Sequence, residues 1–402
     1  MGRLDPGRLA ADLTLLTARH LRRWRRVVQA RPQPGDATRV RVGGRLLRNF
    51  CGNDYLGLSA HPALIEAATA CLAHWGVGAG ASHLVTGHSH EHHALEEELA
   101  AFTGRQRALL FSSGYLANVG VISALAGRHD LIAADRLCHA SLLDGALLSG
   151  ARLRRYAHAD PAAAARALEE RSGSAATALL VTDGVFSMDG DCAPLAQLAP
   201  LAARRDATLV VDDAHGLGVA GTRGRGSLEL SGVDAGAAPV LIGTLGKAFG
   251  TFGAFVAGDA ALVEHLLQHV RTYIYTTALP PAIAAATRTA LRLVDGEPWR
   301  RERLHSLVRR WRAAAAALGL PLAPSDTPIQ PLRVGDAARA LELSEALMAA
   351  GFWVAAIRPP TVPAGSARLR ITLTAAHQEA DVDALAETLA RAWRASERAG
   401  GA

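Results

Sequence analysis

The sequence has 402 residues, of which 50% are hydrophobic and 20% are charged, with a formal net charge of +6. A chain of this length and composition can bury a large core and suits one large and one small domain. The charge comes from scattered arginines without the interleaved aromatic residues of a nucleic-acid platform, and no apolar stretch reaches the roughly 20 residues of a membrane span, so we expect neither partner.

The cysteines and the amino terminus suggest a cytoplasmic protein. The four cysteines are far apart and form no Cys-x-x-Cys pair, which predicts reduced thiols. The amino terminus has no apolar core of the signal-peptide type. Residues 8–30 are rich in arginine and amphipathic; a transit peptide would show the same pattern, but we predict an amino-terminal helix.

The next part of the chain is predicted to contain a hairpin and two helices. Residues 38–50 alternate around a pair of glycines, which is typical of a hairpin. A helix is predicted from Pro62, then a glycine loop at 76–80 and a second helix over 91–102. Four histidines, His88, His90, His92 and His93, stand at the start of that helix. Because no carboxylate or cysteine completes a compact zinc set, we predict a solvated, adventitious nickel-binding surface and no catalytic metal.

Strands and helices then alternate, which predicts an α/β fold with a mainly parallel, doubly wound sheet. The strands are expected at 108–111, 131–133, 178–181, 209–211 and 240–242, with helices from Tyr115, Ser141 and Pro194. Residues 259–318 are predicted to be almost wholly helical, and the tail to form a small α+β domain. We expect an amino-terminal segment over 1–50 that packs with the small domain, a large domain over 51–295 and the small domain over 296–402.

Two of these apolar strands lead into reactive side chains. The first is followed by Asp212, Asp213 and His215, and the second by Thr244 and Lys247. Ligands of open α/β sheets sit beyond the carboxyl ends of strands. Lys247 stands between small residues, which favours the neutral amine that Schiff-base chemistry needs. A carboxylate suits a cationic heterocycle, so we predict pyridoxal 5'-phosphate (PLP), with Lys247 on the aldehyde and Asp212 on the ring nitrogen.

Other readings of this stretch are weaker. Gly246-Lys247 resembles the end of a phosphate loop, but Ala248 stands where Ser or Thr is required. The glycines from 216 to 221 match the dinucleotide pattern, but no helix opens after them. The polar residues could also be ordinary loop residues.

Several further positions could contribute to the site. Gly114 and Tyr115 open a helix whose N–H groups could bind the phosphate, unless Ser113-Gly114 is only a cap. His139 could place its imidazole against the cofactor, and Ser187 could donate a hydrogen bond, although a structural histidine and a simple turn are the alternatives. Arg358, held by adjacent prolines, is suited to bidentate capture of a carboxylate.

The sequence resembles the α-oxoamine synthases, PLP enzymes of the aspartate-aminotransferase fold (fold type I), from about residue 20 to its end. The resemblance rests on segments 53–58 (NDYLGL), 134–142 (ADRLCHASL), 184–191 (GVFSMDGD), 211–216 (VDDAHG), 244–247 (TLGK) and 368–377 (RLRITLTAAH).

The resemblance implies roles for particular residues. Lys247 would bind the cofactor and move the α-proton, while Asp212 and His215 would contact the ring nitrogen and phenolic oxygen. His139 would stack on the ring and Ser187 would bond nearby. Phosphate contacts would come from Gly114, Tyr115, Thr244 and, from a second subunit, Thr276 or Thr277. Substrate would contact Arg358, Thr361, His139 and Arg22, with Arg23 and Arg25 as alternatives to Arg22.

The resemblance also implies a reaction. The loop 356–365 is similar to that of the member which condenses L-alanine with a pimeloyl thioester, carried on coenzyme A or acyl carrier protein, with loss of CO2. The family implies a homodimer with its active site between subunits. Alternatives are the members that use glycine or serine with acetyl, succinyl or palmitoyl thioesters, and a PLP aminotransferase.

Overall fold

The computed structural model describes residues 5–31, 36–171 and 176–400, so the ends of the predicted terminal segments, 1–4 and 401–402, lie outside the described residues. The chain folds into two compact units. The larger unit contains residues 53–187 and 191–303, and the smaller unit contains 1–52, 188–190 and 304–402.

The larger unit is built on a seven-stranded sheet in the order β4-β10-β9-β8-β7-β5-β6. Strands β6, β5, β7, β8 and β9 are parallel, and β10 is antiparallel to both of its neighbours, β9 and β4. The strands are β4 (Arg107–Phe111), β5 (Leu131–Asp135), β6 (Arg152–Tyr156), β7 (Ala178–Asp183), β8 (Thr208–Asp212), β9 (Val240–Thr244) and β10 (Ala254–Gly258). The predicted α/β fold class with a mainly parallel sheet is confirmed.

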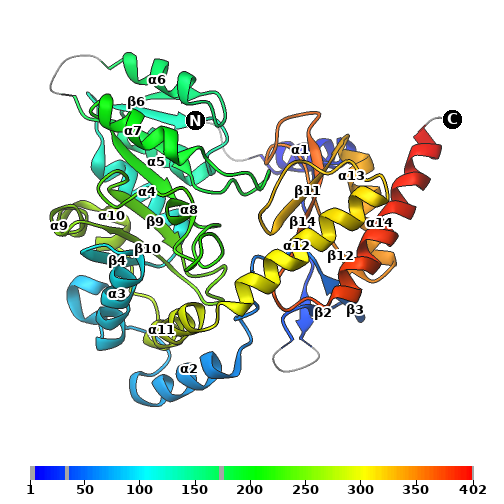
Figure 1. Cartoon of the computed structure of the whole chain (residues 1–402), viewed down its shortest axis with the longest axis horizontal. Coiled ribbons are helices and arrows are strands. Elements are labelled where there is room, and N and C mark those ends of the chain that lie inside the picture. The colour runs from blue at the N-terminus through cyan, green and yellow to red at the C-terminus, as the bar shows by residue number, and fades with distance from the viewer. Residues whose placement is uncertain (1–4, 32–35, 172–175, 401–402) are drawn as a thin grey trace. The chain divides into compact units, whose positions relative to one another are not determined.

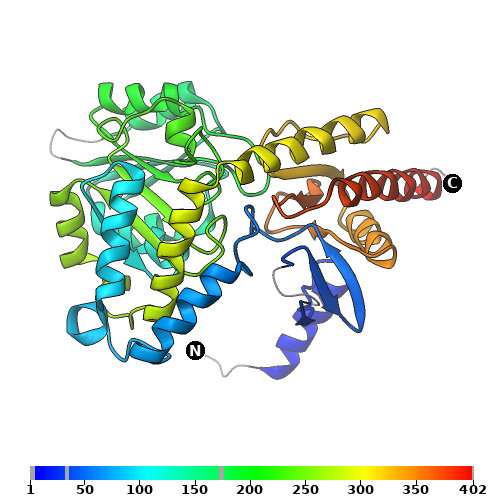
Figure 2. The ribbon, with the colours of Figure 1, turned by 60° about the horizontal axis from the view of Figure 1, so that its bottom comes forward.

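Helices cover both faces of this sheet (Figure 1). Successive side chains of a strand point to opposite faces of the sheet, so the core of the larger unit has two layers, one on each face. Val210 packs in the layer under α4 and α5, whereas Leu209 and Val211 pack in the layer under α6 and α7. The helical elements are α2 (Pro62–Trp75), η1 (His83–Gly87), α3 (His90–Thr103), α4 (Gly114–Leu125), α5 (Ala140–Ser149), α6 (Pro161–Glu169), α7 (Leu195–Arg204), α8 (Ser227–Leu230), α9 (Ala260–His269), α10 (Arg271–Ile274) and α11 (Pro281–Gly296). Helix α11 packs against α2 and α3 (Figure 2).

The smaller unit contains two sheets, in the orders β1-β2-β3-β12 and β11-β14-β13. The antiparallel pair β2 and β3 confirms the predicted hairpin. The strands of the smaller unit are β1 (Val28–Ala30), β2 (Arg39–Val42), β3 (Arg45–Asn49), β11 (Ile329–Gly335), β12 (Phe352–Trp353), β13 (Ala355–Ile357) and β14 (Ala367–Thr372). Its helices are α1 (Pro6–Ala18), α13 (Ala337–Ala349), α14 (Glu379–Gly400) and most of α12 (Trp299–Ala317), which begins in the larger unit.

Two features differ from the sequence analysis. The amino-terminal helix predicted within residues 8–30 ends at Ala18, and the chain becomes a strand at Val28. His20 has a φ of 56°, a left-handed conformation that does not continue an α-helix. Strands β6 and β10 were not predicted; the five residues of β10 lie between a glycine-rich turn and a helix.

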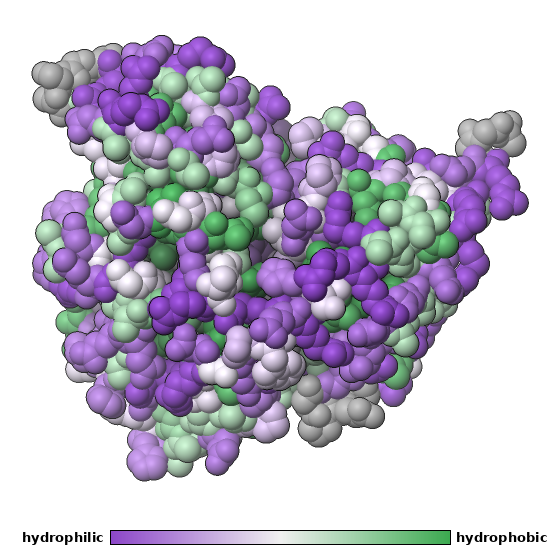
Figure 3. Space-filling view, viewed as in Figure 1, coloured by the Kyte–Doolittle hydropathy of each residue, from purple (hydrophilic) through white to green (hydrophobic). Residues whose placement is uncertain are grey.

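The surface is mixed in character. Hydrophilic residues predominate on the face shown in Figure 3, with hydrophobic residues exposed in patches among them. Among the residues that the structure describes, no helix is both long and apolar enough to cross a lipid bilayer.

Candidate active site

Two neighbouring parallel strands of the larger unit end at polar residues singled out in the sequence. Strand β8 ends at Asp212, and β9 ends at Thr244, three residues before Lys247. In the register of the two strands, Asp212 lies opposite Ile242. Because ligands of such sheets bind beyond the carboxyl ends of strands, this edge is the candidate active site.

Lys247, which is the only lysine of the chain, contacts His215. The Lys247 Nζ atom lies 2.8 Å from His215 Nε2, and His215 Nδ1 lies 2.7 Å from the Tyr55 hydroxyl. That hydroxyl donates to Asn53 Oδ1 at 3.2 Å. These contacts join Lys247, His215, Tyr55 and Asn53 in one network.

Asp212 is buried and is held in place by two hydrogen bonds. Its Oδ2 atom accepts from the side-chain amide of Asn118 at 2.5 Å, and its Oδ1 atom accepts from the backbone N–H of Ala214 at 3.0 Å. These two hydrogen bonds fix the orientation of the carboxylate at the end of β8.

His139 is linked to the same network. The Asn118 amide also donates to Ser141 Oγ at 2.8 Å, and Ser141 Oγ lies 2.6 Å from His139 Nδ1. Desolvation of the ring is the main cause that lowers the pKa of His139, so its imidazole is neutral at neutral pH. A neutral ring fixed at one nitrogen is suited to stacking on a planar ligand.

The amino terminus of α4 lies beside Thr244. The helix begins at Gly114, and a Cβ atom at that position would lie 4.0 Å from Thr244 Oγ1. The Thr244 hydroxyl donates to the Gly253 carbonyl at 3.1 Å. The Tyr115 side chain is exposed and donates to Asp144 Oδ2 at 2.5 Å. Of these groups, the helix N–H donors and the Thr244 hydroxyl are suited to a phosphate.

Some predicted residues are not joined to this network by the contacts described above. Ser187 lies in the loop after β7 and is the last residue of the segment 53–187 of the larger unit. Thr276 and Thr277 follow α10, and the Thr277 carbonyl accepts from Ser112 Oγ at 3.4 Å.

Two of the predicted substrate residues, Arg358 and Thr361, line a cavity of about 230 Å³ in the smaller unit, whereas His139 lies in the larger unit. Arg358 donates to the backbone carbonyls of His20 and Arg22, and Arg23 donates to Thr361 Oγ1 at 3.1 Å. The guanidinium of Arg22 instead lies over the ring of Trp24, with 4.0 Å from Cζ to the ring centroid. Of the arginines left open by the sequence, Arg23 is the one that lines this cavity.

The sequence analysis missed Tyr55, Asn118 and Ser141 as members of the network. Tyr55 appeared only within a motif and Ser141 only as the start of a helix. Asn118 could have been found as the one strongly polar side chain within the apolar sequence of α4.

The histidine cluster was also interpreted wrongly in part. His92 is buried, not solvated: Ser89 N–H donates to its Nδ1 at 3.0 Å, and its Nε2 lies 2.7 Å from the Leu279 carbonyl. His92 therefore caps α3 and links it to the segment before α11.

The residues at the edge of the large sheet fit PLP by their chemistry. They include an amine, a buried carboxylate, a neutral imidazole and a helix amino terminus, which match an aldehyde, a ring nitrogen, a ring face and a phosphate.

Comparisons with known proteins agree with this fit. The family model described as aminotransferase class I and II matches residues 47–389. The 8-amino-7-oxononanoate synthase of Methylococcus capsulatus is 62% identical over 383 residues, which cover 95% of this chain and 97% of that protein.

Solved structures resemble the whole chain. A structure of serine palmitoyltransferase with PLP has a TM-score of 0.91 at 31% identity and covers 98% of each chain. The 8-amino-7-oxononanoate synthase of Francisella tularensis has a TM-score of 0.76 at 31% identity and covers 87% of this chain and 99% of that one.

Proposed function

We propose a function for this chain from the premise that it belongs to the class I and II aminotransferase family and, within it, to the 8-amino-7-oxononanoate synthases. The reaction is a PLP-dependent condensation of L-alanine with a pimeloyl thioester, which releases CO2 and the thiol and gives 8-amino-7-oxononanoate for biotin biosynthesis. The contact between Lys247 and His215, beside the strand that ends at Asp212, carries this proposal. The names of the relatives do not favour an aminotransferase.

The residues of the network would hold the cofactor at different atoms. When bound, PLP supplies an electron sink for negative charge at the substrate α-carbon. Lys247 would hold the aldehyde, Asp212 the ring nitrogen and His215 the phenolic oxygen, and His139 would cover the ring. Gly114, Tyr115 and Thr244 would contact the phosphate or its vicinity, and Ser187 would bond nearby.

Lys247 also would move the proton of the reaction. Its amine would remove the α-proton of L-alanine and would later return a proton to the product. His215, 2.8 Å from the amine and fixed by Tyr55, would orient it. Asp212, held in position by Asn118, would keep the ring nitrogen protonated and thereby strengthen the withdrawal of negative charge from the α-carbon.

Substrate recognition is proposed for the cavity of the smaller unit. Arg358 would receive the carboxylate of L-alanine in a bidentate pair, and Thr361 would contact substrate. Arg22 had the same role in the sequence analysis, but the contacts favour Arg23 for it.

Arg358→Lys is expected to raise the KM for L-alanine by about ten- to a hundredfold, because a charge-assisted hydrogen bond is lost with the planar guanidinium. PLP occupancy, measured by absorbance, should not change. Arg333→Lys is the matched control, since Arg333 is exposed and pairs with Asp189. An unchanged KM for Arg358→Lys would show that another group binds the carboxylate.

The reaction itself is tested with a panel of amino acids and acyl thioesters, by following CO2 and thiol together. We expect L-alanine with pimeloyl thioester to be preferred over glycine or serine with acetyl, succinyl or palmitoyl thioesters. Comparison of coenzyme A with acyl carrier protein as the thiol identifies the donor. A preference for glycine with acetyl or succinyl thioester would retain the family but contradict this reaction.

We further propose a cytoplasmic homodimer with its active site at the subunit interface, where Thr276 or Thr277 contacts the phosphate of the other subunit's site. Thr277 and Tyr275 are exposed in the single chain, which suits such a contact. None of the four cysteines forms a disulfide, as is typical of a reducing compartment. Sedimentation velocity and cell fractionation test the two parts, and a monomeric active enzyme would contradict the first.

A further inference from the structure

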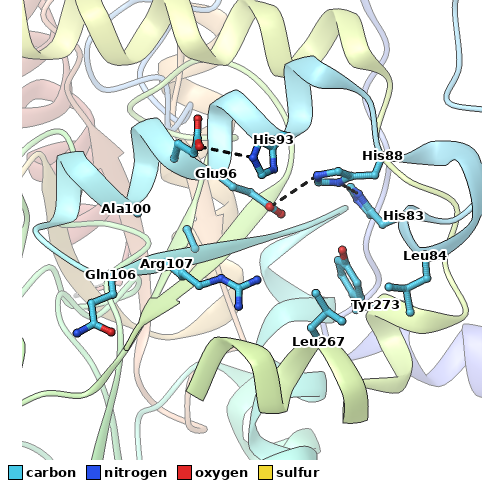
Figure 4. Close-up of a pocket in the computed structure, with 12 residues that line it drawn as sticks. His83, Leu84, His88, His93, Glu96, Ala100, Gln106, Arg107, Leu267 and Tyr273 are labelled. Atoms are coloured by element: carbon cyan, nitrogen blue, oxygen red, sulfur yellow. Dashed lines mark hydrogen bonds and ion pairs between the residues drawn. The ribbon is translucent and has the colours of Figure 1, made fainter. Parts of the chain in front are cut away.

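A second cavity, of about 240 Å³, lies in the larger unit among residues that the proposed reaction does not use. His83, His88, His93, Glu96, Arg107 and Tyr273 contribute to its lining (Figure 4). The sequence analysis found no carboxylate that would complete a compact zinc set with the histidines, but the structure places Glu96 beside His88 and His93.

Three side chains converge at one end of this cavity. One potential ligand atom from each of His88, His93 and Glu96 lies within 4.8 Å of the other two. The His88 Nε2 and Glu96 Oε2 atoms are 3.9 Å apart. His93 and Glu96 are three residues apart on α3, so they project from the same side of the helix. In a tetrahedral zinc site with bonds of about 2.0–2.1 Å, ligand atoms lie roughly 3.4 Å apart, which small side-chain rotations would reach.

His83 orients one of these imidazoles. The Nδ1 atoms of His83 and His88 are 2.9 Å apart, which leaves His88 Nε2 toward Glu96. Metal-ligating histidines characteristically have their other ring nitrogen fixed by such a partner. His92 is not a candidate ligand, because both of its ring nitrogens are already engaged.

Glu96 is similarly fixed through one oxygen. Its Oε1 atom accepts from the Leu110 N–H at 2.9 Å, which leaves Oε2 near His88. The Arg107 guanidinium, which also lines the cavity, pairs with Glu264 Oε2 at 2.8 Å.

We propose that His88, His93 and Glu96 form a site for a divalent transition metal ion of the Zn²⁺ type. Two imidazoles and one carboxylate are a known zinc ligand set, and a fourth position would be open to water from the cavity. The site is independent of the reaction proposed for Lys247.

The test is metal binding by the PLP-loaded protein after treatment with a chelator. Zn²⁺ is titrated by calorimetry, and Co²⁺ is added as a spectroscopic probe whose visible bands report tetrahedral ligation. We expect one ion per chain in the wild type. His93→Ala and Glu96→Gln should each raise the Kd by on the order of a hundredfold. Loss of a residue that only hydrogen-bonds a metal ligand already weakens metal binding about tenfold or more. The His93 side chain is 64% exposed, so its loss should not impair folding.

Two control variants separate this site from adventitious binding. Glu97→Gln removes an exposed carboxylate that lies 3.5 Å from His93 Nε2 but outside the three ligands. The double variant His265→Ala/His269→Ala removes a stacked histidine pair on α9, with ring centroids 4.2 Å apart. Both controls should bind metal as the wild type does. The proposal is overturned if the wild type binds no metal, if His93→Ala keeps the wild-type Kd and Co²⁺ spectrum, or if the α9 variant loses the ion.

Discussion

Replacing Lys247 by alanine is expected to lower turnover by at least about a thousandfold, because one residue supplies both the covalent anchor and the proton-transfer group. No other lysine in the chain can substitute for it. His215 and Tyr55 would keep their own contact at 2.7 Å, so the site should remain folded. The measurement is the rate of thiol release with L-alanine and a pimeloyl thioester.

Two controls distinguish lost chemistry from lost structure. Lys247→Arg keeps a side chain of similar length but replaces the nucleophilic amine with a guanidinium that stays protonated, so it should be as inactive as the alanine variant. Added methylamine should partly restore Lys247→Ala, because it can occupy the space of the missing amine. Wild-type turnover by either variant would remove Lys247 from the mechanism.

Asp212→Asn is expected to lower kcat on the order of a hundredfold or more while PLP stays bound. A neutral amide has the same shape as the carboxylate but cannot keep the ring nitrogen protonated, so charge at the α-carbon is less stabilised. The Asn118 amide, which donates to Asp212 at 2.5 Å, can still donate to the amide oxygen. Steady-state kinetics and cofactor absorbance measure the two effects separately.

The neighbouring carboxyl group is the matched control. Asp213 is buried, and burial raises its pKa to about 7. Its Oδ2 atom accepts from Ser227 N–H at 2.7 Å, so its carboxyl group holds the loop after β8 in place. Asp213→Asn should therefore change kcat much less than Asp212→Asn does. The assignment of the ring nitrogen to Asp212 is wrong if the order of the two effects is reversed.

Strand ends were the part of the site most open to prediction. Two apolar strands end at Asp212 and Thr244, and Lys247 follows three residues after the second. The local sequence therefore indicates where these residues lie. The partners of these residues could not be found in this way. Tyr55 contacts His215 across 160 positions and Asn118 contacts Asp212 across 94, and only tertiary packing creates such pairs.

The difference between local sequence and tertiary packing also explains the wrong prediction for the histidine cluster and the open choice between Arg22 and Arg23. The histidines looked solvated because their helix has charged residues around them, whereas packing of α3 against α11 buries His92. Arg22 and Arg23 cannot be separated by composition, because both stand in one arginine-rich stretch. The contacts of Arg23 with Thr361 and of Arg22 with Trp24 separate them.

The most direct test of a PLP site centred on Lys247 is reduction of the PLP-loaded protein with borohydride, followed by peptide mapping. Reduction converts the bond between cofactor and amine into a stable secondary amine. Since the chain has one lysine, the account predicts a single modified peptide, the one that contains Lys247, and loss of the visible absorbance band. Cofactor found only on the terminal amine, or an absorbance band that is lost without any adduct on Lys247, would contradict it.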